Sequence, residues 1–316
     1  METVKTQYGD LPATGLIDRY ADGSVRAAWV NAPFSLETAV GSLVPQYTID
    51  DSRRMTKPPV TFYPNGQVRS VPLEKRAMLA TPAGPLPAEL VTFHENGAVA
   101  RVFPLNGKLS GYWTEADEAG IAEILHLETA AGPLAAKLVA VAFDPDGHLR
   151  SLTLWPGEET TVQTPVGALA VRFGVSFYPT GAVRSVEPAR PVAVETPVGS
   201  IVAYDSDAVG ISGDANSLCF DPAGVVTRIA TVRTSLRVRL ADGARAEFAP
   251  LVRESICGDG DREMTPLVLE FATAVVTARY GTGEPVATLP RAGAVFTPCP
   301  FVSVFAVPFA PKQCSM

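Results

Sequence analysis

Acidic residues gather in one glycine-bearing tract of the sequence, and they are the side chains best suited to hold a metal ion. The tract contains Asp205, Asp207 and Asp214. Carboxylate oxygens on a loop suit Ca²⁺. The spacing is not that of an EF-hand, because Val209 occupies a ligand position and Asn216 stands where a bidentate Glu is needed. These three residues are candidate metal ligands, but an ordinary acidic loop is the favoured interpretation, so we expect no metal or cofactor.

Other reactive side chains are few and scattered. The three histidines are His94, His126 and His148, and the first and last fall in expected turns, where solvated polar residues belong. No spacing indicates a nucleophile, a histidine and an acid acting together. The four cysteines lie far apart without a Cys-x-x-Cys pair, so a zinc site is not expected. We therefore assign no catalytic residues.

Aromatic and acidic residues are combined in the tract Asn106–Glu118. Tyr112 and Trp113 are followed there by Glu115 and Asp117. Tyr and Trp are enriched in interface hot spots, and acids favour the approach of a basic partner. We predict that these four residues bind a partner, with Trp113 as the anchor. The competing interpretation is that Trp113 only packs this insertion onto the rest of the fold.

A repeated turn motif must position these tracts. Five copies share a Phe four residues before a glycine and a Val or Leu two residues after it, and a weaker copy surrounds Gly23. Such internal repetition decides the fold class. The glycines of the five copies are Gly66, Gly97, Gly147, Gly181 and Gly224.

A second motif, Thr-x-x-Gly, alternates with the first along the chain. Each copy has an apolar residue two positions before the Thr and another two positions after the Gly. Alternating turns lie at opposite edges of a sheet, which predicts an antiparallel meander of repeated hairpins. A sheet this large must curl, so we expect an all-β rolled sheet or β-solenoid-like array. The second-motif glycines are Gly41, Gly84, Gly132, Gly167 and Gly199.

Proline near the turn glycine argues for a three-residue loop in both motifs. A two-residue loop at Gly66 would place Pro64 where a backbone N–H must pair. A type I turn closed by a glycine at positive φ avoids this and sets Phe62 opposite Val68. Val71 would then share a face with Arg69. Either that face is partly covered, or a further bulge resets the register.

The segment from Phe62 to Val71 resembles the repeat of MORN-variant proteins, including those of the toxin-immunity or antitoxin-component type. Phe177–Val186 and Asn106–Trp113 are similar to it. The likeness covers about a third of the chain, and the family's repeat is shorter, more even and without the Thr-x-x-Gly motif. The resemblance implies a hairpin array that binds another molecule, and it carries over no catalytic residues.

The last part of the chain breaks the pattern. We predict a hairpin repeat array over residues 1–230 and a β segment over 231–316 that caps the array, because an open sheet end needs a cover. Asp242-Gly243 favours one more hairpin. Thr265–Tyr280 is typical of strand, with a short helix as the alternative. Val302–Val307 alternates and predicts a late or edge strand.

Composition bounds the function. The 316 residues are 47% hydrophobic and 19% charged, which favours a folded core over disorder. The net charge is −7 without a basic block, so nucleic acid is not an expected partner. No signal peptide or membrane-length apolar run is evident, which indicates a cytoplasmic protein. The favoured function is a non-catalytic scaffold that recognises another macromolecule, most simply a protein. The alternatives are an enzyme or small-ligand-binding protein, with its site in the C-terminal segment or in the insertions that interrupt the array, and a structural assembly subunit. The insertions are residues 46–58, 106–122 and 204–216.

Overall fold

The structure is a computed structural model that describes residues 3–13, 15, 17–50, 52–208, 213–214, 216–254 and 262–302. The chain forms two compact units: unit 1 comprises Met1–Val186 and Gly210–Ala215, and unit 2 comprises Glu187–Val209 and Asn216–Met316. We expected a division near residue 230. It falls earlier because the last hairpin of the expected array, which contains Gly224, pairs with C-terminal strands within unit 2.

The described elements are almost entirely β-strands, which confirms the predicted all-β class. The helix of unit 1 is α1 (Glu115–Ile121). The strands up to the end of unit 1 are β1 (Thr3–Thr6), β2 (Gly9–Pro12), β3 (Asp18–Arg19), β4 (Val25–Ala28), β5 (Leu36–Thr38), β6 (Gly41–Leu43), β7 (Val60–Phe62), β8 (Val68–Thr81), β9 (Gly84–Phe93), β10 (Val99–Phe103), β11 (Ile124–Thr129), β12 (Gly132–Phe143), β13 (Leu149–Leu154), β14 (Glu159–Thr164), β15 (Gly167–Phe177) and β16 (Val183–Pro188).

Unit 2 is built from shorter strands. They are β17 (Val192–Thr196), β18 (Gly199–Ala203), β19 (Leu218–Phe220), β20 (Val226–Thr231), β21 (Thr234–Arg239), β22 (Arg245–Phe248), β23 (Leu251–Glu254), β24 (Arg262–Thr265), β25 (Leu267–Phe271), β26 (Val275–Tyr280), β27 (Pro285–Pro290) and β28 (Val295–Pro300). The hairpin predicted at Asp242-Gly243 joins β21 to β22, and Thr265–Tyr280 holds two strands, β25 and β26. The strand predicted at Val302–Val307 lies outside the described residues after its first position.

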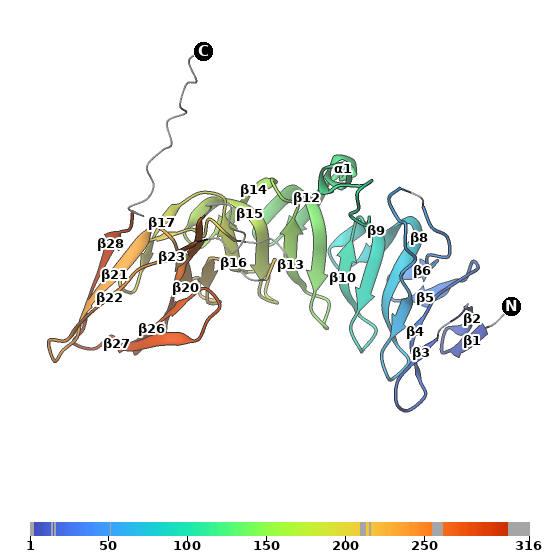
Figure 1. Cartoon of the computed structure of the whole chain (residues 1–316), viewed down its shortest axis with the longest axis horizontal. Helices are drawn as coiled ribbons and strands as arrows, with labels where there is room; N and C mark the ends of the chain where they lie inside the picture. Colours follow the sequence, from blue (N-terminus) through green and yellow to red (C-terminus); the bar gives the residue numbers. More distant parts are fainter. Residues whose placement is uncertain are drawn as a thin grey trace, which may run out of the picture. The chain divides into compact units, whose positions relative to one another are not determined.

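The main sheet is antiparallel and has seventeen strands in the described part of the chain. Its order in unit 1 is β3-β4-β7-β8-β9-β10-β12-β13-β15, and in unit 2 it is β19-β20-β25-β26-β27. β10 pairs directly with β12, and β13 with β15, so β11 and β14 branch away with the Thr-x-x-Gly turns. The sheet therefore departs from a simple meander. In Figure 1, α1 lies at the edge of unit 1 opposite the turns that join β9 to β10 and β12 to β13.

The turns of the first motif have the predicted geometry. Their five glycines have φ between 82° and 90°, where only glycine is unstrained. In each case the residue after the Phe closes a three-residue loop, as Tyr63 does by donating its N–H to Gln67 and accepting from Gly66. Four of the five predicted cross-strand pairs are confirmed: Phe62–Val68, Phe93–Val99, Phe143–Leu149 and Phe220–Val226. The fifth, Phe177–Val183, stays a prediction.

A bulge follows the turns of Gly66, Gly97, Gly147 and Gly224 and decides between the two alternatives for Val71. Phe62 faces Val68, but Thr61 faces Ser70, so Arg69 is the extra residue. The same shift leaves one extra residue in the hairpins of Gly23, Gly97, Gly147 and Gly224. Val71 consequently returns to the Phe side of the sheet, where both side chains are buried. The bulge resets the register.

The turns of the second motif contradict the predicted three-residue loop. Thr81 pairs directly with Gly84 and Leu79 with Leu86, so the loop has two residues. The Thr81 hydroxyl donates to the Gly84 carbonyl at 2.6 Å and accepts the Ala83 N–H at 3.2 Å. This side-chain closure, which the sequence analysis overlooked, makes a bulge unnecessary. The same pairing occurs at Gly41, Gly132, Gly167 and Gly199, and at an unrecognised copy, Thr6–Gly9.

Side chains at the first-motif turns tie each hairpin to the next. The hydroxyl of Tyr20 donates to the Phe62 carbonyl at 2.8 Å, and that of Tyr63 donates to the Phe93 carbonyl at 2.9 Å. His94 Nε2 lies 3.0 Å from the Phe143 carbonyl, which requires a proton on that nitrogen. His94 is therefore partly buried in an inter-hairpin contact, whereas we had expected a solvated turn residue.

The turn glycines of unit 1 allow a graded test of this geometry. At Gly23 (φ 85°) an added Cβ meets open space, whereas at Gly181 (φ 83°) it lies 2.6 Å from the Ala130 Cβ. Gly23→Ala should cost about 1 kcal/mol through backbone strain, and Gly181→Ala clearly more. Thermal unfolding measures both. Gly111→Ala, with neither positive φ nor a close neighbour, is the control. Equal melting temperatures for all three variants would contradict the assigned turns.

Candidate functional site

Two inserted tracts of unit 1 meet at a buried group of charges. Arg53, from the tract 46–58, forms hydrogen bonds of 2.6–2.9 Å with both oxygens of Glu89 and of 2.7–2.8 Å with both oxygens of Glu118. The side chains of Glu89 and Glu118 are buried, and that of Arg53 is 13% exposed. A guanidinium fork matches a carboxylate geometrically, and here it serves two. We call Arg53, Glu89 and Glu118 the ion network.

An irregularity in the β8–β9 ladder places Glu89 in the network. Pro72 pairs with Leu90 and Ala77 with Ala88, so four residues of β8 lie opposite Glu89 alone. The carbonyls of Leu73 and Glu74 in this bulge accept hydrogen bonds from Arg54. The tract 46–58 thereby docks on the interruption of the ladder. A lone acid within the apolar run of β9 was the signal for Glu89, which the sequence analysis missed.

The tract Asn106–Glu118 closes the network from the other side. The N–H groups of Asn106 and Gly107 donate to Glu89 and Glu118, both at 2.8 Å. A Cβ at Gly107 would lie 2.2 Å from a Glu118 oxygen, so only glycine fits there. Thr114 begins α1 with a capping box to Asp117. α1 ends at Ile121, and β11 begins at Ile124.

The network favours the ionised form of Glu118. Burial by itself raises the pKa of Glu118, but hydrogen bonds from Arg53, Gly107 and Trp113 outweigh it and lower the pKa below the usual value. For Arg53, burial opposes the charged form, yet hydrogen bonds to Glu118 and Glu89 raise its pKa. Two acids on one arginine leave a net negative charge, which these donors stabilise. The network thus holds the two tracts together through charged hydrogen bonds.

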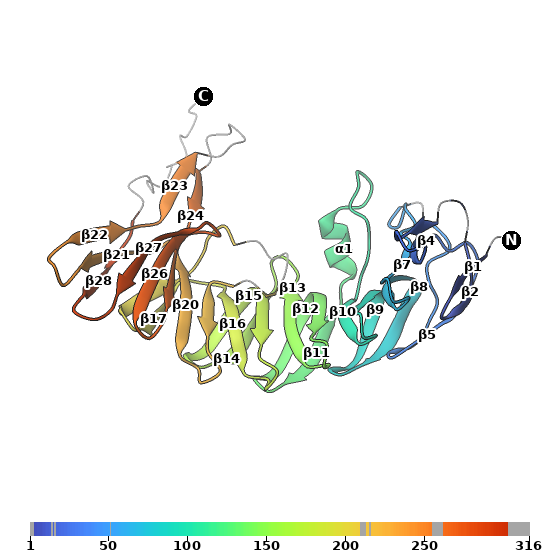
Figure 2. The same ribbon diagram turned by 90° about the horizontal axis from the view of Figure 1, so that it is seen from below.

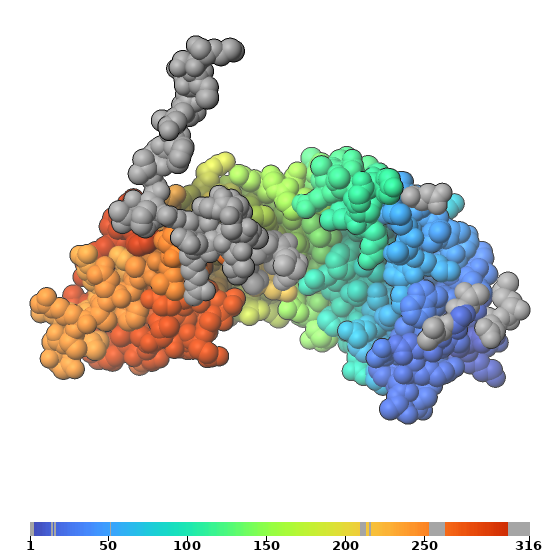
Figure 3. All heavy atoms as spheres, in the orientation of Figure 1, coloured from blue at the N-terminus to red at the C-terminus, as the bar shows by residue number. Residues whose placement is uncertain are grey.

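The four predicted partner-binding residues have different environments. The Trp113 indole N–H donates to Glu118 at 2.6 Å, and the side chain is only half-buried. Tyr112 is 80% exposed, and Glu115 is exposed beside it. Asp117 is also exposed, and hydrogen bonds from Thr114 lower its pKa. In Figure 3 this tract forms a raised part of the surface of unit 1, and Figure 2 shows α1 standing out from the sheet. The role of Trp113 as an anchor stays a prediction.

Each candidate metal ligand has contacts of its own within its unit. The Asp207 carboxylate accepts the Met264 N–H at 2.7 Å in unit 2, and Asp205 accepts the N–H of Asp207. Asp214 belongs to unit 1 and pairs with Arg150 at 3.1 Å. These contacts give the three carboxylates separate structural tasks.

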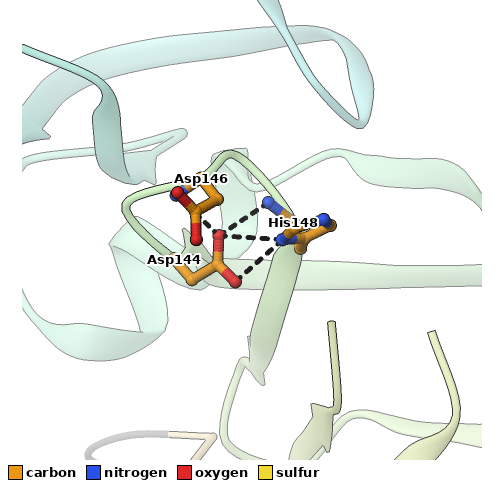
Figure 4. A group of neighbouring side chains, drawn as sticks. All are labelled: Asp144, Asp146 and His148. Atoms are coloured by element: carbon orange, nitrogen blue, oxygen red, sulfur yellow. Dashed lines mark hydrogen bonds and ion pairs between the residues drawn. The ribbon is translucent and has the colours of Figure 1, made fainter. Parts of the chain in front are cut away.

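A different group has metal-ligand chemistry at the tip of the β12–β13 hairpin. One ligand atom each of Asp144, Asp146 and His148 lies within 4.8 Å of the others (Figure 4). His148 Nδ1 is 3.0 Å from an Asp144 oxygen, and the N–H groups of Asp146 and His148 also point to Asp144. Asp144 thereby closes the turn and pairs with the imidazole, which accounts for the group without an ion.

Comparison with known proteins gave no match: no family model, no curated protein and no solved structure is significantly similar to this chain. Within the described residues, no helix is long and apolar enough to cross a membrane.

Replacing Arg53, the cation of the ion network, should lower the free energy of unfolding. Arg53→Met leaves two buried carboxylates without their cation, which typically costs about 3–5 kcal/mol. Urea unfolding of unit 1 measures the loss. Arg76→Met is the matched control, because Arg76 pairs with the exposed Glu123, and such pairs contribute about 0–1 kcal/mol. Equal losses in the two variants would show that the network is not stabilising.

The lowered pKa of Glu118 predicts a loss of stability in acid. A carboxyl with a folded-state pKa below its unfolded value, about 4.3 for Glu, stabilises the fold above that value, and the contribution disappears as pH falls through the folded pKa. The melting temperature should therefore decrease as the pH is lowered from 7 to 3. Glu118→Gln should lower the melting temperature at pH 7 and flatten the acid decline. A variant that keeps the full decline would contradict the assignment.

Divalent metal ions should not stabilise the protein. The carboxylates of Asp144, Asp207 and Asp214 already accept N–H groups, so an ion has to replace existing partners. We expect an unchanged melting temperature with millimolar Ca²⁺ or Zn²⁺. A rise would indicate a site by mass action, and its loss in Asp146→Asn or Asp207→Asn would locate it.

Proposed function

We propose that the protein is a non-catalytic binding protein, a hairpin-repeat scaffold related to MORN-variant proteins, that recognises another protein through the tract Asn106–Glu118. The carrying observation is that this tract is fixed from below by the ion network while Tyr112 and Leu109 are 80% and 61% exposed. Large exposed side chains on a fixed loop lose little conformational freedom on binding.

Local hydrogen bonds fix the loop that carries Tyr112. The Ser110 hydroxyl accepts the N–H groups of Tyr112 and Trp113, both at 3.1 Å, and Ser110 donates its own N–H to the Trp113 carbonyl at 2.8 Å. Lys108 donates its N–H to the Arg53 carbonyl at 2.9 Å. The Tyr112 ring therefore projects from a loop that is held at several points, as an interface anchor requires.

The charges around Tyr112 indicate the character of the partner. α1 has acids in its first turn and no basic residue in its last turn. Glu115 is exposed and available to a partner. Asp117 is exposed too, but its carboxylate also caps α1 through Thr114, and Glu118 is satisfied internally. A protein with a basic surface around an apolar hollow would complement this arrangement.

The repeat array is the scaffold part of this proposal. Its support is the recurrence of one turn geometry, one bulge and one tip contact along the hairpins of unit 1. In such arrays each hairpin contacts its neighbours, and insertions form loops that frequently lie on the binding face.

Tyr112→Ala tests the proposal more cleanly than Trp113→Ala. The Tyr112 side chain is exposed and absent from the ion network, so its removal should abolish co-purification of the partner from the native host without changing the melting temperature. Trp113→Ala should affect both, since its indole also holds Glu118. Met78→Ala, at a side chain that is 65% exposed elsewhere in unit 1, is the control. A partner retained equally by all three variants would place the binding surface elsewhere.

A further inference from the structure

The three-stranded sheet of unit 2 carries a concentration of arginines on one face. The strand order is β22-β21-β28, and Leu236 and Val238 of β21 are buried on the other face. Arg237 and Arg239 alternate with them and are exposed. Together with Arg245 of β22 they line a hollow of about 580 Å³. We call Arg237, Arg239 and Arg245 the arginine face.

Two of these arginines are placed directly opposite each other without compensation. Arg239 pairs in register with Arg245, whereas the neighbouring pair joins Arg237 to Glu247, with 3.3 Å between nitrogen and oxygen. Like charges directly opposite on neighbouring strands are destabilising. Within the described part of the chain, no hydrogen bond or ion pair engages the guanidinium of Arg239 or Arg245. In a chain of net charge −7, this local excess of positive charge favours the binding of an anion.

The hollow is larger and more apolar than a simple ion requires. Val295 of β28, directly opposite Arg239, is 49% exposed at its wall, and Thr297 follows on the same face. Among the described residues, β22 pairs with β21 alone, so its outer edge presents backbone groups to solvent. An open edge accepts an added strand through main-chain hydrogen bonds, with side-chain contacts supplying selectivity.

We propose that the arginine face binds an acidic protein segment in extended conformation, added along the outer edge of β22. Alternate side chains of a strand point to one face. An acid beside Arg245 would therefore share the face of Arg245 and Arg239, whose forks each match a carboxylate. Glu247, which pairs with Arg237 on the same face, leaves the position beside it to an uncharged side chain. The apolar part of the hollow would hold a further side chain of the segment. This surface is in unit 2 and is independent of the tract around Tyr112.

Labelled peptides of two designs test the proposal by fluorescence anisotropy on the full chain. In the first, Glu alternates with Val and Thr, and in the second, the same residues are rearranged with the Glu in one block. The alternating peptide should bind at least about tenfold more tightly, equivalent to one carboxylate–arginine contact. Equal affinity of the two peptides, or full displacement of the alternating one by millimolar phosphate, would reduce the surface to a non-specific anion site and overturn the proposal.

Substitutions locate the binding and separate it from folding. Arg239→Gln and Arg245→Gln should each weaken the alternating peptide about tenfold or more. Because each variant removes a repulsive pair, its melting temperature should not fall. Arg233→Gln, an equal charge change at an exposed residue outside the hollow, should leave affinity intact. If a Gln variant unfolds, Arg245→Lys keeps the charge but not the fork and should still weaken binding. Unchanged affinity in the folded variants would refute the proposal.

Discussion

A glycine at positive φ, followed by a one-residue bulge, is the constraint on which the hairpins of unit 1 depend. The glycine closes a three-residue loop and sets the Phe opposite a Val or Leu. The bulge then restores the alternation, so that residues such as Val71 return to the buried side. Without this second correction, every later residue of the strand would face the wrong side of the sheet. The turn glycine and the bulge thus each set the strand register, both within eight residues of the Phe.

The inserted tracts use places where that regularity fails. The β8–β9 ladder is interrupted opposite Glu89. Arg54 donates hydrogen bonds to the carbonyls of Leu73 and Glu74 there, and Arg53 donates to the Glu89 carboxylate. A buried carboxylate without such partners would be costly. The interruption and the tract 46–58 therefore satisfy each other's polar groups, and the tract Asn106–Glu118 is fixed in turn through the same arginine.

The predictable features were those with local causes. The positive φ at Gly66 and the pairing of Phe62 with Val68 follow from steric rules within ten residues, and the sequence indicated both. The two-residue loop at Thr81 was missed because a hydroxyl, not a bulge, closes it. The ion network joins residues 53, 89 and 118, and nothing local links them. Trp113 was singled out as a partner anchor, which stays a prediction, and its bond to Glu118 depends on that long-range contact.

The regular hairpins use several polar side chains for hydrogen bonds to one another or within their own turns. This limits where they can bind another molecule. Tyr20, Tyr63 and His94 each give a side-chain hydrogen bond to the next hairpin, and the second-motif Thr hydroxyls close their own turns. Groups engaged in this way must lose a partner before they can bind another molecule. Tyr112 and the pair Arg239–Arg245 are different, because a ligand there meets exposed rings or unneutralised charge and displaces no internal contact. The two proposed binding surfaces therefore lie outside the repeated contacts, at exposed side chains that do not hold one hairpin to the next.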